Sequence, residues 1–260
     1  MRYKELCEVY ERLESNSSRL KKIEILAEFF CKIKNEENKE VIYLLQGKVF
    51  PDYSEQEFGI SEKLVIKALS RASGTNEKEI VSLWKNKGDL GIVGGDIIKH
   101  KKQGTLFTNQ LSIKKVIDNL KKLPNYEGKG SVDKKLSVIS ELLTSANPIE
   151  VKYICRTLLG DLRIGVASGT LRDSIVASCF NFDTNEVGEK KKITEAVQGA
   201  YDKVNDLVIV FEKACKGIKN LYATSLTPGH PIKVMLALKA ESIENGFNRV
   251  GKPAAFEYKY

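Results

Sequence analysis

Helical periodicity is the feature that most constrains the fold of this chain. Over about the first 220 of its 260 residues, apolar side chains recur at spacings of three or four, and no segment alternates strictly between apolar and polar positions. A first helix is predicted from Tyr3 to Leu13, ending at the polar residues 15–18, and a second from Leu20 to Ile33. The spacing therefore predicts a mainly α fold.

Helix-start signals divide this region further. Ser61, Thr75 and Ser112 are predicted N-caps, and Pro148 is predicted at an early helix position, where its missing N–H donor costs nothing. The last long helix is predicted over residues 206–216. No self-similarity at a fixed period of about 30–45 residues is present, which disfavours a helical repeat array.

The texture of the sequence changes at about Leu221. Three of the six prolines fall in the final 33 residues. Residues 221–225 are predicted to be a connector, residues 232–240 a short buried helix or strand, and residues 254–260 a strand. About thirty residues cannot form a domain alone. We therefore expect a helical domain over residues 1–222 and the truncated start of an α/β domain over residues 223–260.

Composition excludes several classes of protein. With 42% hydrophobic and 29% charged residues the chain is typical of a globular protein, and it contains no apolar stretch of 18 residues that would span a bilayer. Its N-terminus lacks the apolar core of a signal peptide. The five cysteines are widely spread, which predicts buried free thiols in a reducing cytosol, and two lone histidines offer no metal site. Trp84 and the Phe29–Phe30 pair are predicted to be core residues.

Positive charge is concentrated in residues 99–135. This segment has ten lysines against three acidic residues, a net charge of +7 within a total of +8. One interpretation is an ordinary solvated helix face. The other is a surface for a polyanion, because lysines near phosphates displace condensed counterions. The lysines do not accompany an exposed aromatic or leucine face, which disfavours a membrane-surface helix.

The last five residues place a carboxylate and an amine on one face of an extended segment. Glu257 and Lys259 would point one way, while Phe256, Tyr258 and Tyr260 would form an aromatic wall behind them. A lysine becomes nucleophilic when its surroundings lower the pKa of its amine. By itself the pattern is also typical of a solvated strand.

Several motifs in order resemble the ATP-dependent DNA ligases of the archaeal and eukaryotic replicative type. Their nucleophile motif reads Glu-Tyr-Lys-Tyr-Asp-Gly, and residues 257–260 read Glu-Tyr-Lys-Tyr. Residues 226–237 are similar to the segment that opens the family's adenylation domain, and residues 159–166 to its DNA-contacting turn. Residues 43–51 and 88–91 also match its N-terminal domain.

The resemblance implies roles for individual residues. Lys259 would attack the α-phosphorus of ATP and carry AMP as a phosphoramidate, and Glu257 would accept a hydrogen bond from the adenine amino group. For DNA binding it implies the turn residues Gly160, Arg163, Gly165 and Ala167, which would lie against the duplex minor groove. Asp161 stands where the family has Arg or Lys, which removes one expected contact, and position 230 has His where the family more often has Arg.

The resemblance also implies partners and cofactors. ATP and Mg²⁺ are the expected cofactors and nicked duplex DNA the substrate; a sliding clamp is a further expected partner, with no residue assigned to it. We expect a monomer that is cytoplasmic and associated with the nucleoid. Because the sequence stops before Asp-Gly and the later carboxylates, we expect residues 1–260 to bind DNA without catalysing ligation alone. The alternative is a non-catalytic helical nucleic-acid-binding module whose final Glu-x-Lys is incidental.

Overall fold

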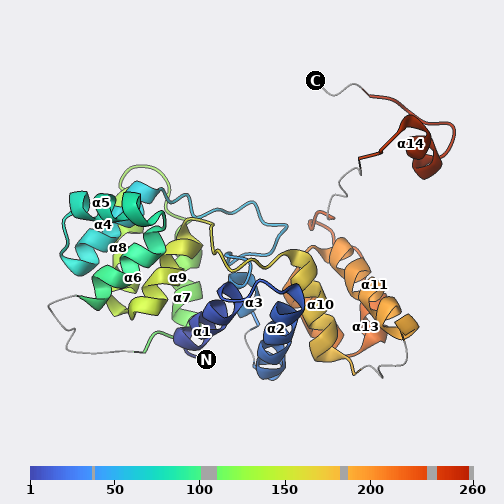
Figure 1. The fold of residues 1–260 in the computed structure, drawn as a ribbon, viewed down its shortest axis with the longest axis horizontal. Helices are drawn as coiled ribbons and strands as arrows, with labels where there is room; N and C mark the ends of the chain where they lie inside the picture. Colours follow the sequence, from blue (N-terminus) through green and yellow to red (C-terminus); the bar gives the residue numbers. More distant parts are fainter. Residues whose placement is uncertain (37–38, 101–109, 182–186, 233–238, 258–260) are drawn as a thin grey trace.

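Helices account for the architecture of the computed structural model, which describes residues 1–36, 39–100, 110–181, 187–232 and 239–257 (Figure 1). Within these ranges the one piece of β pairing is an isolated antiparallel bridge between Arg2 and Ser112, and no strand forms. The predicted mainly α fold is confirmed. Among the helices described, none is both long enough and apolar enough to cross a membrane.

One group of helices, the first lobe, is formed by the middle of the chain. Within it α6 packs along α9 and α4 packs along α8. Its members are α4 (Glu62–Ser73), α5 (Glu77–Lys87), α6 (Leu90–Lys99), α7 (Ile113–Lys122), α8 (Ser131–Ser145) and α9 (Pro148–Leu158).

The second lobe combines helices from both ends of the helical region. Its central contact is between α10 and α2. Its members are α2 (Arg19–Ile33), α3 (Val41–Leu44), α10 (Ser168–Cys179), α11 (Val187–Val204), α12 (Leu207–Cys215) and α13 (Ile218–Tyr222). Helix α1 (Tyr3–Glu14) contacts both α2 and α9 and so joins the two lobes.

Most of the predicted helix starts are confirmed. The Ser61 and Ser112 hydroxyls accept bonds from the amides of the third helical residue, and Pro148 is the first residue of α9. The prediction for Thr75 is wrong by one residue. Asn76 is the cap, because its side-chain oxygen accepts the Lys78 amide at 2.9 Å.

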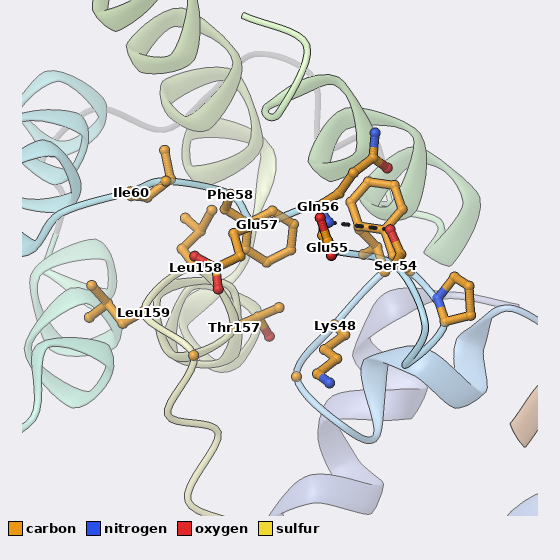
Figure 2. Close-up of a pocket in the computed structure, with 16 residues that line it drawn as sticks. Lys48, Ser54, Glu55, Gln56, Glu57, Phe58, Ile60, Thr157, Leu158 and Leu159 are labelled. Carbon is orange, nitrogen blue, oxygen red and sulfur yellow. Dashed lines mark hydrogen bonds between the residues drawn. The ribbon is translucent and has the colours of Figure 1, made fainter. Parts of the chain in front are cut away.

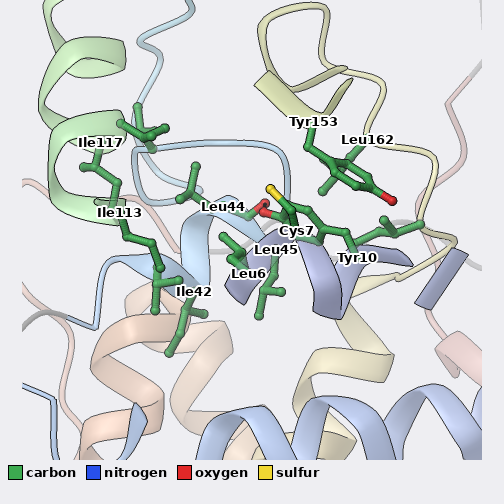
Figure 3. Packing of buried hydrophobic residues seen from close by; sticks show 14 of the residues in the cluster. Leu6, Cys7, Tyr10, Ile42, Leu44, Leu45, Ile113, Ile117, Tyr153 and Leu162 are labelled. Carbon is green, nitrogen blue, oxygen red and sulfur yellow. Dashed lines mark hydrogen bonds between the residues drawn. The ribbon is translucent and has the colours of Figure 1, made fainter. Parts of the chain in front are cut away.

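A buried cluster fills the region where the lobes meet (Figure 3). The Tyr10 ring lies 4.7 Å from the Tyr153 ring, and its hydroxyl donates to the carbonyl of Leu44 at 2.8 Å. Burying each large side chain here contributes roughly 1.5–3 kcal/mol. Leu162, which follows α9, belongs to the same cluster, so the segment between the lobes is anchored in the core. Phe29 and Phe30 are buried as predicted, whereas Trp84 is only half-buried.

The C-terminal part of the chain packs differently from the helical lobes. Thr224, within the predicted connector of residues 221–225, is buried, and Lys203 and Lys213 donate to its carbonyl and hydroxyl at 3.0 and 3.1 Å. Beyond it, residues 225–229 are exposed, and α14 (Ile243–Val250), which was not predicted, has no buried residue. Residues 254–257 form no strand, and residues 233–238 and 258–260 lie outside the described part.

Candidate nucleic-acid interface

The segment that crosses from α9 to α10 is an exposed turn over residues 160–167. Gly160, Arg163 and Gly165 have left-handed backbones, with φ of +69°, +56° and +60°. This conformation is unfavourable for an arginine, so the surrounding contacts must hold it. Leu162 and Ile164 are buried between the exposed residues 161, 163 and 165. The turn therefore presents alternate residues to solvent from an anchored backbone.

A buried lysine of α2 holds the second half of the turn. Lys22, 8% exposed, donates its ammonium group to the carbonyls of Ile164 and Gly165 at 2.7 and 3.0 Å. A side chain at Gly165 would collide with this ammonium group, and the residue also has a positive φ. The backbone conformation therefore favours glycine at 165, and a larger residue would also displace the Lys22 ammonium group. Gly160 also has a positive φ but open space around it.

A buried arginine of α9 holds the first half. Arg156, 3% exposed, bonds Asp89 at 2.7 Å and Glu14 through two parallel bonds of 2.8 and 2.9 Å. It also reaches the carbonyl of Leu162 at 3.4 Å. Burial would raise the pKa of both carboxyl groups, but bonds from Arg156 outweigh it: the pKa of Glu14 is lowered to about 2 and that of Asp89 below its ordinary value. Both carboxylates are therefore ionised at neutral pH.

Arg163 joins this ion-pair cluster at its surface. Its guanidinium donates to Asp161 at 2.7 Å and to Asp89 and the Gly88 carbonyl at 3.2 Å each. Its side chain is nevertheless 45% exposed. Because a guanidinium binds phosphate with the same fork geometry that it uses for carboxylate, Arg163 has the chemistry and the exposure to contact a nucleic-acid backbone.

Two hollows lie beside Leu159, which contributes to the lining of both. The smaller, about 330 Å³, is lined by Arg156, Arg163 and the half-buried Trp84. The larger, about 410 Å³, lies between the loop of residues 47–60 and the end of α9 (Figure 2). The loop of residues 47–60 and the turn of residues 160–167 both connect the two lobes. The turn therefore lies beside the other connection between the lobes.

In the basic segment of residues 99–135, several lysines bond to other parts of the protein. Lys121 pairs with Glu40, Lys115 lies 3.1 Å from Glu141, and Lys135 donates to the Phe58 carbonyl at 3.0 Å. These three lysines are partly neutralised or held by the protein itself. Lys101 and Lys102 lie outside the described residues. Binding of a polyanion by this segment stays a prediction.

The predicted nucleotide site is only partly described. Glu257 is exposed, and Lys259 lies outside the described residues. Phe256, expected in a packed aromatic wall, contacts Phe247 edge-on but is 78% exposed. The described residues contain no group of three or more His, Cys, Asp or Glu side chains able to hold a metal ion.

Sequence reasoning missed the residues that support the turn. Glu14, Lys22 and Arg156 were not singled out, and Asp89 was noted only as part of a motif. One signal was present: Arg156 directly follows the apolar residues Tyr153-Ile154-Cys155 of a predicted helix, and an arginine that is buried needs a carboxylate partner.

Comparisons with known proteins identify the family of this chain. A family model described as DNA ligase N terminus matches residues 2–176. The chain is 41% identical over 262 residues to the DNA ligase of Methanosphaera stadtmanae, a match that covers 99% of this chain and 45% of that protein. It is 40% identical to the DNA ligase of Thermococcus fumicolans and 37% identical to that of Nanoarchaeum equitans, over its whole length and 45% and 44% of theirs. The chain thus spans less than half the length of these curated relatives. By the family model that covers most of its residues, the chain belongs to the DNA ligase N terminus family.

Proposed function

We propose that this chain is part of an ATP-dependent DNA ligase. Residues 1–222 form its DNA-binding part, which binds duplex DNA at nicks, and its nucleotide site includes residues within 223–260. The observation that carries the DNA-binding part is the turn of residues 160–167. Its exposed guanidinium at Arg163 is bonded to Asp89, which is itself paired with the buried Arg156. Its second half is held by Lys22, which donates to the carbonyls of Ile164 and Gly165. The end of α13 at Tyr222 supports the division between the two parts.

The turn suits a ligand whose sequence varies. Arg163 offers guanidinium donors to phosphate and to the minor-groove edge, where base identity is poorly distinguished. The exposed residues Gly160, Gly165 and Ala167 beside it have small or no side chains, which lets a duplex approach closely. A ligase must seal nicks in any sequence, so contacts of this kind fit the proposed role. DNA binding also places the protein on the nucleoid, where its family's substrate would be found.

Binding is tested by fluorescence anisotropy with a nicked duplex across a salt series. If about 4–6 phosphates are neutralised, affinity falls about 10²–10³-fold between 50 and 200 mM salt, and duplexes of different sequence bind alike. Undetectable binding at low salt, or an affinity that ignores salt, would reject the proposal. Size-exclusion chromatography with light scattering, with and without DNA, tests the predicted monomer; no clamp-contacting residue is proposed.

The catalytic part of the proposal assigns the nucleophile to Lys259. Its neutral amine would attack the α-phosphorus of ATP, forming a P–N bond as the bond to the β-phosphate breaks, with loss of a proton and release of pyrophosphate. The AMP then passes to a 5′-phosphate, and a 3′-hydroxyl displaces it. Glu257 is proposed to accept a hydrogen bond from the adenine amino group. The family implies Mg²⁺, but the described residues do not fit a metal site, so we assign it no ligand here.

Adenylation is tested in a fusion of residues 1–260 to the part of the Methanosphaera stadtmanae ligase that follows the matched region. Incubated with ATP and Mg²⁺, the fusion should gain the mass of one AMP on the peptide that contains Lys259. Lys259→Ala should abolish the adduct, while Lys252→Ala, seven residues earlier, should retain it. An adduct on the Lys259→Ala protein would reject the assignment.

A further inference from the structure

The exposed turn carries a negative charge directly beside its arginine. The Asp161 carboxylate accepts the Arg163 Nε–H at 2.7 Å, and the two side chains are 59% and 45% exposed. The same guanidinium faces a second carboxylate, Asp89, which is buried and already bonded to Arg156. Of the two carboxylates, Asp161 is the one that solvent and ligand can reach.

A phosphate that approaches Arg163 must compete with the Asp161 carboxylate for the N–H donors of the guanidinium group. Carboxylate and phosphate oxygens compete for the same N–H donors, and a phosphate beside Asp161 meets an uncompensated negative charge. Because an exposed ion pair in water is weak, it is exchanged and not locked. The ion pair therefore lowers the affinity of the turn for phosphate without preventing phosphate from binding.

We propose that Asp161 is a built-in competitor for Arg163 and sets the DNA affinity of the turn. This inference rests on the proposed DNA-binding function. A ligase must leave the sealed product, so a turn whose arginine returns to an internal carboxylate favours release. The device needs no conformational change beyond the exchange of partners by one guanidinium group.

The test is a double-mutant cycle of Asp161→Asn and Arg163→Ala, followed by anisotropy with nicked duplex at 50 and 200 mM salt. Asp161→Asn should raise affinity roughly 3–10-fold at 50 mM salt, with a smaller gain at 200 mM. In the Arg163→Ala background the gain should fall below about twofold, because the group for which Asp161 competes is gone.

Glu28→Gln is the matched control. Glu28 pairs with Arg12 at the same 2.7 Å, both side chains are at least half exposed, and the variant changes net charge by the same amount. It should change affinity by less than about twofold. Failure of the wild type to bind would reject the proposed function as well. Wild-type binding with no gain from Asp161→Asn, or an equal gain in both backgrounds, would reject only the competitor role.

A second and independent observation concerns two cysteines. Cys179 is the last residue of α10 and Cys215 the last of α12, and their sulfur atoms lie 3.5 Å apart at partly exposed positions. A hydrogen bond from Cys179, together with the positive charges of Lys34 and Lys39, lowers the pKa of Cys215 to about 7. The predicted pattern of buried thiols holds for Cys7 and Cys155 but not for this pair or for the exposed Cys31.

We infer that Cys179 and Cys215 form a modification site that a hydroperoxide converts to a disulfide. The Cys215 thiolate attacks the terminal oxygen of the peroxide and becomes a sulfenic acid as the O–O bond breaks. The alkoxide that leaves takes a proton from water and becomes an alcohol. Cys179 then attacks that sulfur, the S–S bond forms, and water departs with the Cys179 proton. One peroxide is reduced for two thiols oxidised. The link would fasten the ends of α10 and α12 together.

Peroxide treatment of the 260-residue protein, followed by alkylation and peptide mapping, tests this site. A Cys179–Cys215 cross-linked peptide is expected, with a rise of roughly 5–10 °C in Tm that a dithiol reductant reverses. Cys31→Ser should leave the cross-link intact, and Cys215→Ser should abolish it. Cross-linking of Cys31 instead, or separate over-oxidation of the two thiols, would overturn the inference.

Discussion

The two lobes each contain a helix start built on the same backbone. In the first lobe a left-handed Gly88 (φ +68°) precedes Asp89, and in the second a left-handed Asn205 (φ +50°) precedes Asp206. Both aspartates have φ −145° and ψ 110°, and each accepts the amides of the second and third residues of its helix. Locally the two starts are the same structure.

Their surroundings are opposite. Asp89 meets the guanidinium groups of Arg156 and Arg163, whereas Asp206 accepts the Tyr43 hydroxyl at 2.9 Å through both oxygens. Burial raises the pKa of both carboxyl groups; the arginines reverse this for Asp89, but the bond from Tyr43 does not reverse it for Asp206. The comparison teaches that one cap geometry serves two purposes: at Asp206 it starts a helix, and at Asp89 it also supports an exposed turn.

The largest expected difference lies in the partners of the two aspartates. Arg156→Ala leaves the buried Asp89 with only its longer bond to Arg163, and Glu14 with only Lys152 as a cationic partner. It should lower the free energy of unfolding by about 3–5 kcal/mol. Tyr43→Phe removes one hydroxyl bond and should lower it by about 1–2 kcal/mol. Urea unfolding followed by helical circular dichroism measures both. Equal losses would break the comparison.

Neutralising each aspartate itself should show more clearly how the two helix starts differ in their contribution to stability. Asp89→Asn keeps a capping oxygen but leaves Arg156 short of charge, so at pH 7 we expect a loss of about 2 kcal/mol. Asp206→Asn also keeps a cap and removes a charge that burial disfavours, so stability should change by less than about 1 kcal/mol in either direction. The same urea experiment on matched variants decides, and a larger loss for Asp206→Asn would contradict the comparison.

The two carboxyl groups should also respond to pH with opposite signs. The pKa of Asp89 is lowered, so its contribution is present above the ordinary value of 3.8 and is lost as pH falls through the folded value. The pKa of Asp206 is raised, so its contribution is present below 3.8 and is lost as pH rises through the folded value.

Unfolding of the wild type and both Asn variants from pH 3 to 7 should show this directly. The stability deficit of Asp89→Asn relative to the wild type should shrink toward the acid end. For Asp206, the free energy of unfolding of the wild type relative to that of Asp206→Asn should increase as the pH falls. Parallel pH curves for all three proteins would show that the two aspartates do not differ in ionisation.

The smallest effects should come from the left-handed residues before the caps. Gly88→Ala places a Cβ in open space but in an unfavourable backbone, and should cost about 1 kcal/mol. Asn205→Gly relaxes the same conformation and should stay within a few tenths of a kcal/mol of the wild type. Thermal unfolding measures both effects. If Gly88→Ala caused no loss of stability, the backbones at the two helix starts would not be constrained in the same way.

What sequence could and could not predict follows the same division between local and distant contacts. Ser61, Ser112 and Pro148 mark helix starts through bonds to residues within three positions, so the pattern was sufficient. The bonds from Arg156 to Asp89 and to Glu14 join residues 67 and 142 positions apart. Only the packed fold specifies such pairs. The turn was recognised by its motif, but its support was not.

Arg163 and Asn205 provide the most direct test, because they are the non-glycine residues with positive φ in the described chain. Replacing either with glycine relaxes the backbone equally, but only Arg163→Gly removes a proposed DNA contact. In anisotropy titrations with nicked duplex, the account predicts that Arg163→Gly weakens binding roughly 5–150-fold and flattens the salt dependence by about one phosphate contact, while Asn205→Gly binds as the wild type does. Equal affinity for both variants would contradict the claim that the turn of residues 160–167 is the DNA-binding element.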